Sequence, residues 1–156
     1  MSKTLKIGDL APDFTLYTDN DEKLTLSSLR GKNVVLYFYP KDDTPGCTLE
    51  AKDFTTSHDQ FLFLNTVVIG ISKDPVHSHS KFKEKYCLPF TLVSDINGEV
   101  CEQYSTWTEK SMFGKKYMGI ERTTFLIDQQ GIIRKIWNKV SVSGHVNDVL
   151  DAVKHL

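Results

Sequence analysis

Residues 33–49 read NVVLYFYPKDDTPGCTL, and this stretch decides the fold class. Its first part, Asn33–Tyr39, is a run of β-branched and aromatic residues that is typical of a central strand buried on both faces. Pro40–Gly46 follows as a turn, because two prolines and a glycine restrict the backbone there. Cys47 then begins an amphipathic stretch that predicts a helix to about Leu64.

The alternation of strand and helix continues along the chain. Residue patterns predict further strands at residues 11–17, 24–26, 66–72, 90–94, 123–127 and 132–137, and helices at residues 27–31, 75–86, 98–104 and 147–156. Residues 107–119 are polar and weakly patterned, so we expect a loop there. Gly131, in the short connection 128–131, is suited to the positive φ of a closing hairpin. The chain is therefore predicted to form a single domain over residues 1–156, an α/β fold with a central mixed β-sheet and helices on both faces.

The composition disfavours several classes of protein. With 156 residues, 40% hydrophobic and 25% charged, the chain has the composition of an ordinary globular domain. A net charge of −1 without blocks of like charge gives no indication of a nucleic-acid partner. The longest apolar run is about five residues, far short of a membrane span, and residues 1–10 lack the apolar segment of a signal peptide. We expect a cytoplasmic protein that binds neither nucleic acid nor membrane.

The three cysteines, Cys47, Cys87 and Cys101, are too few and too scattered for a disulfide scaffold. None of them forms a Cys-x-x-Cys pair, and His77 and His79 have no second ligand pair nearby. These spacings do not match those of zinc sites, so we expect neither a metal nor a cofactor.

Cys47 is the most informative of the three because it falls in the first turn of a predicted helix. Unpaired amide groups and the helix dipole favour a negative charge there, and hence the thiolate. Thr44, three residues earlier, offers a hydroxyl that both donates and accepts, and so suits a thiolate and a peroxide oxygen together. A cysteine near a helix start is also often a small buried hydrophobe, and position alone leaves both interpretations open.

A family resemblance favours the chemical interpretation. Pro40, Thr44 and Cys47 stand as Pro-x-x-x-Thr-x-x-Cys, which is the active-site pattern of the peroxiredoxins. Residues 37–48 resemble the peroxiredoxin Q branch of that family, also called bacterioferritin comigratory protein. Similar segments extend over nearly the whole chain, at residues 8–14, 92–95, 100–104 and 122–128. The resemblance implies a thioredoxin-like fold and a thiol peroxidase that reduces hydrogen peroxide and organic hydroperoxides.

The resemblance also implies roles for individual residues. Cys47 would be the peroxidatic thiolate that becomes sulfenic acid, and Pro40 would shield it from water. Thr44 would hydrogen-bond the thiolate and the peroxide, while Arg122 would favour the thiolate and orient the peroxide. Without the resemblance, a solvated arginine at a strand end is the usual interpretation of Arg122, although its fixed fork of donors suits the role. Glu50, one turn after Cys47, either pairs with a basic neighbour or is a plain surface carboxylate.

The chain departs from the resemblance at Lys52, because many members carry a resolving cysteine at that position. We therefore expect a one-Cys enzyme whose sulfenic acid is reduced by thioredoxin, or by glutaredoxin with glutathione. Cys87 is a possible resolving residue, which would require local unfolding because a disulfide needs nearby Cα atoms. Cys101 is more consistent with packing. The resemblance favours a monomer.

Two other functions remain open at this point. A thiol-disulfide oxidoreductase on the same fold is disfavoured by the lack of a Cys-x-x-Cys pair. A peroxide-sensing redox protein would oxidise Cys47 to signal to a partner. Turnover with a peroxide and a thiol distinguishes catalysis from sensing.

Overall fold

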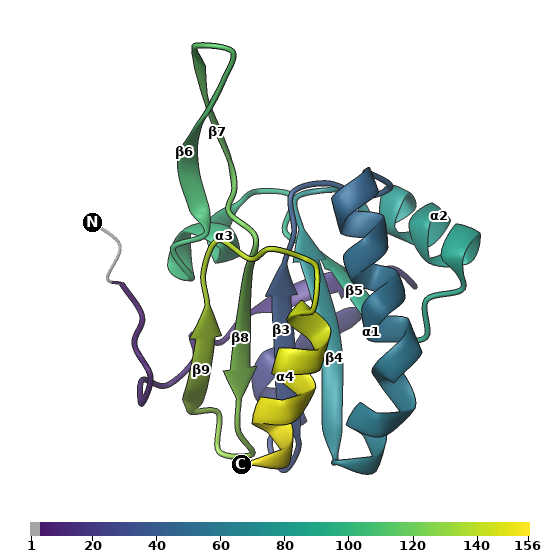
Figure 1. Cartoon of the computed structure of the whole chain (residues 1–156). Helices are drawn as coiled ribbons and strands as arrows, with labels where there is room; N and C mark the ends of the chain where they lie inside the picture. Colours follow the sequence, from purple (N-terminus) through teal and green to yellow (C-terminus); the bar gives the residue numbers. More distant parts are fainter. Residues whose placement is uncertain (1–3) are drawn as a thin grey trace.

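The computed structural model describes residues 4–156, and its centre is a seven-stranded mixed sheet (Figure 1). The strands of this sheet are β1 (Thr15–Thr18), β2 (Lys23–Thr25), β3 (Asn33–Phe38), β4 (Thr66–Ser72), β5 (Thr91–Ser94), β8 (Thr123–Ile127) and β9 (Ile133–Trp137). They lie in the order β2-β1-β5-β4-β3-β8-β9. β3 is parallel to β4 and antiparallel to β8, so the predicted mixed sheet is confirmed.

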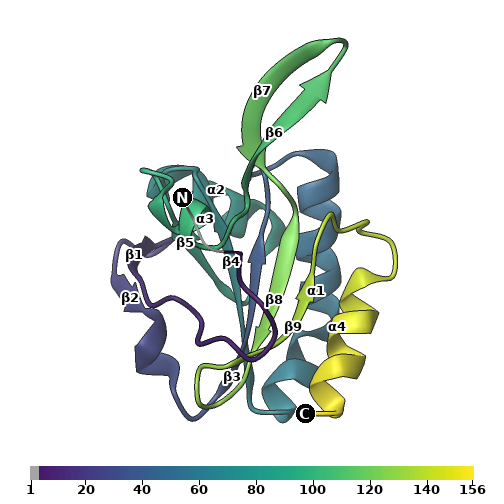
Figure 2. The same cartoon turned by 90° about the vertical axis from the view of Figure 1, so that its left-hand side faces the viewer.

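Helices cover both faces of this sheet, as predicted. On one face lie α1 (Pro45–Phe63), α2 (Val76–Tyr86) and α4 (His145–Lys154) (Figures 1 and 2). On the other face lie α3 (Glu99–Gln103), the 3-10 helix η1 (Leu26–Leu29) and residues 5–14. Within residues 4–156, none of these helices is both long and apolar enough to cross a membrane.

The buried strand β3 separates two apolar clusters. Val35 and Tyr37 belong to the cluster under α1, α2 and α4, while Leu36 and Phe38 belong to the cluster on the opposite face. Neighbouring side chains of a strand point to opposite faces, so a strand between two packed layers must be apolar throughout. All six residues of β3 are buried, which explains the continuous apolar run in the sequence.

The prediction of a loop at residues 107–119 is wrong. These residues form a second, two-stranded sheet from β6 (Trp107–Met112) and β7 (Lys115–Ile120), which projects from the body of the molecule (Figures 1 and 2). The turn residues Phe113 and Gly114 have φ of 51° and 78°, as a two-residue hairpin with two positive φ angles requires. The sequence shows little alternation of polar and apolar residues here, because most side chains of this hairpin face solvent on both sides.

The other elements lie where the sequence predicted them, with shifted ends. β4 and β8 have the predicted bounds, whereas β1 begins four residues after the predicted start at residue 11. α1 begins two residues before Cys47. Gly131 has a φ of 84°, so its predicted role in the β8–β9 connection is confirmed.

Candidate active site

Cys47 lies in the first turn of α1. This helix begins beyond the carboxyl end of β3 (Figure 1). Thr44 is the N-cap in an extended conformation, and Pro45 is the first helical residue, a position where the missing N–H costs nothing. The Cys47 side chain is 2% exposed and belongs to the apolar cluster under α1. The N-terminal amides and the dipole of a long helix therefore act on a sulfur that is shielded from water.

Strand pairing brings Arg122 to this sulfur from far along the chain. β8 runs antiparallel to β3 and pairs Thr123 with Phe38, so the residue before Thr123 lies beside the loop that follows β3. The Arg122 Nη2 donates to the Cys47 Sγ over 3.4 Å. The structure thus brings Arg122 and Cys47 together, as the resemblance implied.

Gly46 leaves the room that this contact requires. A Cβ atom at Gly46 would lie 3.2 Å from Nη2 of Arg122, which is tighter than ordinary van der Waals contact. A larger residue at this position would displace the guanidinium.

Glu50 is the second partner of Arg122. Its side chain is completely buried, and its Oε1 accepts a hydrogen bond of 2.6 Å from Nη1 of Arg122. Of the two interpretations left open by the sequence, the paired one is correct. Burial raises the pKa of Glu50 to about 7, against the opposing effect of the Arg122 charge.

Arg122 remains charged in this setting. Burial lowers its pKa, but the nearby Glu50 and Cys47 outweigh that effect and raise the pKa above its ordinary value. Its side chain is 16% exposed, so the guanidinium contacts the sulfur and still reaches the surface.

Thr44 differs from the expectation. Its hydroxyl donates to the carbonyl oxygen of Lys41 over 2.8 Å, and within residues 4–156 it makes no hydrogen bond to Cys47. A hydroxyl has one proton, and here the local turn uses it, so only the acceptor positions of Thr44 remain available. Pro40 is half-buried where the chain leaves β3.

Two side chains near the sulfur were missed by the sequence reasoning. Tyr37 is buried, and its hydroxyl has no hydrogen-bond partner among residues 4–156. Burial, then the charges of Glu50 and Cys47, raise its pKa. Lys110 in β6 is half-buried, and burial, then the charge of Arg122, lower its pKa. Lys110 was assigned to a loop, whereas the hairpin rises from the same end of the sheet as the loop before α1 (Figure 1).

The other two cysteines are in different surroundings. Cys87 is exposed at the C-cap of α2, with a φ of 52°. Cys101 is completely buried in α3, and burial raises its pKa strongly, which keeps it a thiol. All three cysteines are free thiols in this structure.

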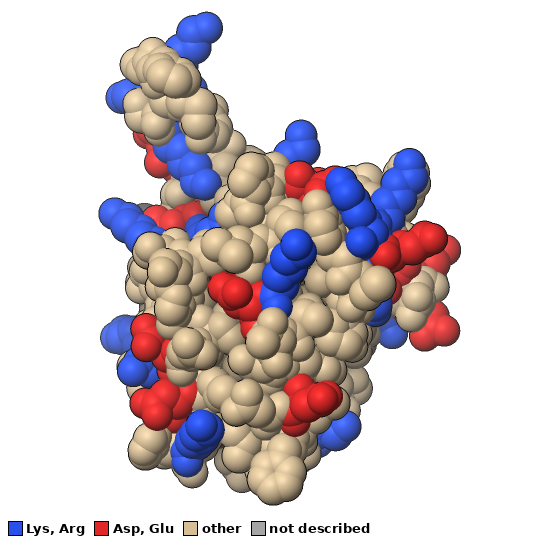
Figure 3. All heavy atoms as spheres, turned by 45° about the vertical axis from the view of Figure 1, so that its right-hand side comes forward, with Lys and Arg blue, Asp and Glu red and all other residues tan. Residues whose placement is uncertain are grey.

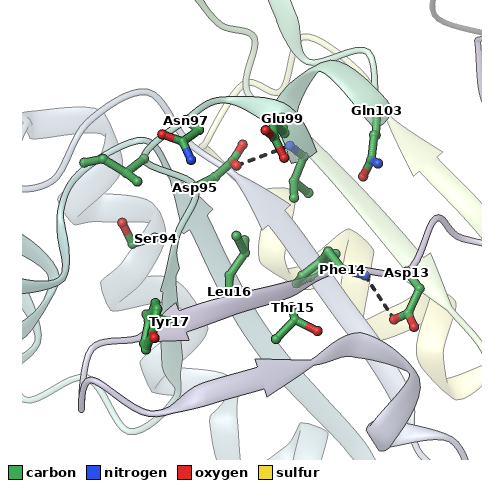
Figure 4. A pocket seen from close by; sticks show the side chains of 12 residues that line it. Asp13, Phe14, Thr15, Leu16, Tyr17, Ser94, Asp95, Asn97, Glu99 and Gln103 are labelled. Atoms are coloured by element: carbon green, nitrogen blue, oxygen red, sulfur yellow. Dashed lines mark hydrogen bonds between the residues drawn. The ribbon is translucent and has the colours of Figure 1, made fainter.

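A cavity of about 370 Å³ between β1 and α3 is lined by residues such as Leu16, Asn97 and Gln103, and by none of the four predicted site residues (Figure 4). Asp95 at its edge accepts the backbone N–H of Val100 and so caps α3. On the face seen in Figure 3, acidic and basic side chains are interspersed, while basic ones gather on the projecting hairpin.

The chain is similar to several known proteins over most of its length. The model of the AhpC/TSA family matches residues 7–136. The chain is 56% identical over 147 residues to a putative peroxiredoxin bcp of Coxiella burnetii, covering 94% of this chain and 97% of that protein. It is 50% identical over 153 residues to peroxiredoxin Bcp of Bacillus subtilis, covering 98% of both chains.

Solved structures show the same fold. A mutant of Xylella fastidiosa PrxQ superposes with a TM-score of 0.93 at 37% identity, covering 99% of this chain and 98% of that one. A structure of the bacterioferritin comigratory protein of Xanthomonas campestris, described for its alkyl peroxide reduction activity, has a TM-score of 0.87 at 39% identity. The superposition covers 91% of this chain and 90% of the Xanthomonas chain.

Proposed function

Since this chain belongs to the AhpC/TSA family and is a thiol peroxidase of the peroxiredoxin Bcp and PrxQ type, we propose that Cys47 is its peroxidatic residue. One observation carries this proposal: the Cys47 sulfur lies in the first turn of α1, with Nη2 of Arg122 at 3.4 Å. A helix N-terminus and a fixed cation both stabilise a thiolate, which is the nucleophilic form.

The reaction is a two-electron transfer from sulfur to peroxide. The Cys47 thiolate attacks the terminal peroxide oxygen, so an S–O bond forms while the O–O bond breaks. The other oxygen leaves with a proton as water or an alcohol, and Cys47 becomes sulfenic acid. Hydrogen peroxide and alkyl hydroperoxides are the proposed substrates, in line with the alkyl peroxide reduction described for the Xanthomonas relative.

Arg122, Thr44 and Pro40 are the proposed partners of Cys47. Arg122 stabilises the thiolate and the negative charge that develops on the peroxide oxygens, together with the free amides of α1. Thr44 accepts a hydrogen bond from the incoming peroxide and donates to the thiolate once its hydroxyl turns away from Lys41. Pro40 shields the sulfur from water at the start of the loop.

An external thiol is the proposed reductant of the Cys47 sulfenic acid. Lys52 stands where many family members have a resolving cysteine, and its Nζ lies over the Tyr86 ring at 5.3 Å from the centroid. One thiol condenses with the sulfenic acid to a mixed disulfide and water, and a second releases Cys47. Thioredoxin, or glutaredoxin with glutathione, fits this chemistry. Cys87 on the exposed end of α2 is the alternative, as an internal resolving residue.

We further propose that the protein acts as a monomeric single domain in the cytoplasm. A reducing compartment would keep all three cysteines as thiols. The monomer rests on the resemblance to peroxiredoxin Q.

Intact mass after one equivalent of hydrogen peroxide tests the function. The reduced protein is treated with and without a sulfenic-acid trap, beside Cys47→Ser and Cys87→Ser variants. A gain of one oxygen that is trapped at Cys47 supports both the peroxidatic role and an external reductant. Loss of two hydrogens that disappears in Cys87→Ser would identify Cys87 as the resolving residue. An unmodified Cys47 would contradict the proposal.

A further inference from the structure

The loop before Cys47 is anchored by a buried carboxylate. Asp42 is 7% exposed, and its side chain is bonded to three others. Its Oδ1 accepts from the Tyr39 hydroxyl over 2.6 Å, and its Oδ2 accepts from the Ser78 hydroxyl over 2.8 Å. The Nδ1 of His79 lies 2.8 Å from the same Oδ2. The loop is thereby tied to the end of β3 and to α2.

His79 extends this anchor to the sheet. The ring is completely buried, and its Nε2 lies 2.9 Å from the carbonyl oxygen of Val93 in β5. Because a carbonyl only accepts, Nε2 must carry a hydrogen, and the tautomer follows from the partners. The other ring nitrogen, Nδ1, faces the carboxylate of Asp42. Charge-assisted hydrogen bonds of this kind are strong when they are shielded from water.

The backbone of the loop needs such an anchor. Asp43 has a φ of 57°, a left-handed conformation that is disfavoured for a residue with a side chain. Its carboxylate accepts from Nζ of Lys85 over 2.8 Å and from the Tyr86 hydroxyl over 2.7 Å, both at the end of α2. The Asp43–Lys85 pair is solvent-exposed and therefore weak, so the buried link from Asp42 to His79 holds more of the loop.

We propose that His79 is a positioning residue for the peroxidase reaction, because it holds the loop that carries Pro40 and Thr44 and leads into Cys47. This inference rests on the proposed role of Cys47. Arg122 is placed independently, by the pairing of β8 with β3, so movement of the loop changes the distance between the guanidinium and the sulfur.

Release of the loop has two opposite consequences. The reaction with peroxide slows, because the sulfur and its donors lose their alignment. Reagents larger than peroxide gain access to Cys47, which is only 2% exposed in the intact fold. If His79 only stabilised the protein as a whole, both effects would follow the loss of either of its hydrogen bonds. If it positions the loop, they follow the loss of the bond to Asp42.

Two substitutions separate the two bonds of His79. His79→Asn places a donor near the position of Nδ1 and keeps the bond to Asp42, whereas His79→Gln places one near Nε2 and keeps the bond to Val93. His77→Gln, at an exposed position of the same helix, is the matched control. The rate of Cys47 oxidation by hydrogen peroxide and the rate of its modification by a maleimide are measured, with peptide mapping to separate Cys47 from Cys87.

In His79→Gln we expect peroxide oxidation to slow by about tenfold or more and maleimide modification to accelerate. His79→Asn should lie nearer the wild type in both rates, and His77→Gln should match it. Equal changes in the Asn and Gln variants, or wild-type rates in His79→Gln, would overturn the proposal and leave His79 as core packing.

A milder variant covers the case in which His79→Gln does not fold. Ser78→Ala removes one donor to Asp42 from a half-buried position, and we expect smaller shifts in the same two directions. Unchanged rates in folded Ser78→Ala would then overturn the inference. A failure of the proposed function would be visible separately, since Cys47 would remain unoxidised in the wild type.

Discussion

At the scale of single residues, the site depends on one arginine with two partners. The guanidinium of Arg122 donates from Nη2 to the Cys47 sulfur and from Nη1 to Glu50, over 3.4 Å and 2.6 Å. A planar fork serves two acceptors in fixed directions, whereas an ammonium group is a point charge on a flexible stem. The identity of the cation therefore matters as much as its charge.

Arg122→Lys should keep the charge but slow the oxidation of Cys47 by about 100-fold, comparable with the loss of one donor from an oxyanion hole. The second-order rate constant with hydrogen peroxide measures this effect. Arg134→Lys is the matched control, because that arginine, in β9, is 48% exposed and pairs with Asp128. A rate in Arg122→Lys equal to that of the control would mean that charge alone suffices.

Glu50→Gln should change how stability depends on pH. The pKa of Glu50 is about 7 in the folded protein and about 4.5 when solvated, so both states hold the proton below pH 4.5. Between pH 4.5 and pH 7 the unfolded state gives up a proton that the folded state still holds, so the stability contributed by Glu50 falls over this range and is lost above pH 7. The free energy of unfolding of Glu50→Gln minus that of the wild type should therefore increase by on the order of 3 kcal/mol from pH 4.5 to pH 8.

Urea unfolding of both proteins at the two pH values measures this difference. The wild-type curve alone does not isolate Glu50, because burial lowers the pKa of His145 to about 4, and that group titrates in the same range with the opposite sign. Glu109→Gln, at a position 58% exposed, is the control and should show no such trend. A pH-independent difference for Glu50→Gln would contradict the buried ionisation.

At the scale of elements, the close approach of β3, β4 and β5 behind α1 depends on Gly70. A Cβ atom at this position would lie 2.8 Å from Cδ2 of Leu92 and 2.9 Å from the ring and hydroxyl of Tyr37. Tyr37 in turn stacks on Phe54 of α1, with 4.6 Å between ring centroids. The glycine therefore leaves the space in which the tyrosine packs under the helix that carries Cys47.

Gly70→Ala should lower the free energy of unfolding by about 1–3 kcal/mol, because it overpacks the core between neighbouring strands. Denaturant unfolding measures the loss. Gly119→Ala in β7 is the control, since its Cβ would meet only the flexible side chain of Lys110, at 3.2 Å. Equal stabilities of the two variants would show that the core relaxes freely around Tyr37.

At the scale of the whole molecule, the sheet joins two cores into the proposed single domain. Leu36 in β3 and Leu92 in β5 are both completely buried, and they belong to the clusters on opposite faces. Since both clusters share the same strands, the loss of one should not leave the other folded.

Leu36→Ala and Leu92→Ala, the same substitution on the two faces, should each lower the free energy of unfolding by about 2–5 kcal/mol. In both variants, near- and far-ultraviolet circular dichroism should report one coincident transition. Two separated transitions in either variant would contradict a single cooperative domain.

The sequence alone determined the features that depend on a few neighbouring residues. The apolar run of β3, the start of α1 near Cys47 and the turn at Gly131 each have a local cause, in burial on both faces, helix end groups and a positive φ. The hairpin of β6 and β7 was missed, because a ribbon exposed on both sides needs no alternation of polar and apolar residues.

Only the tertiary structure decided which polar groups meet. Arg122 lies 75 residues from Cys47 and 72 from Glu50, and His79 lies 37 from Asp42. The contacts of Arg122 with Cys47 and Glu50 follow from the register of β3 against β8. The contact of His79 with Asp42 follows from the packing of α2 on the loop. Burial of Glu50 and His79 depends on the same packing. Desolvation is a property of the whole fold, and no local pattern of residues specifies it.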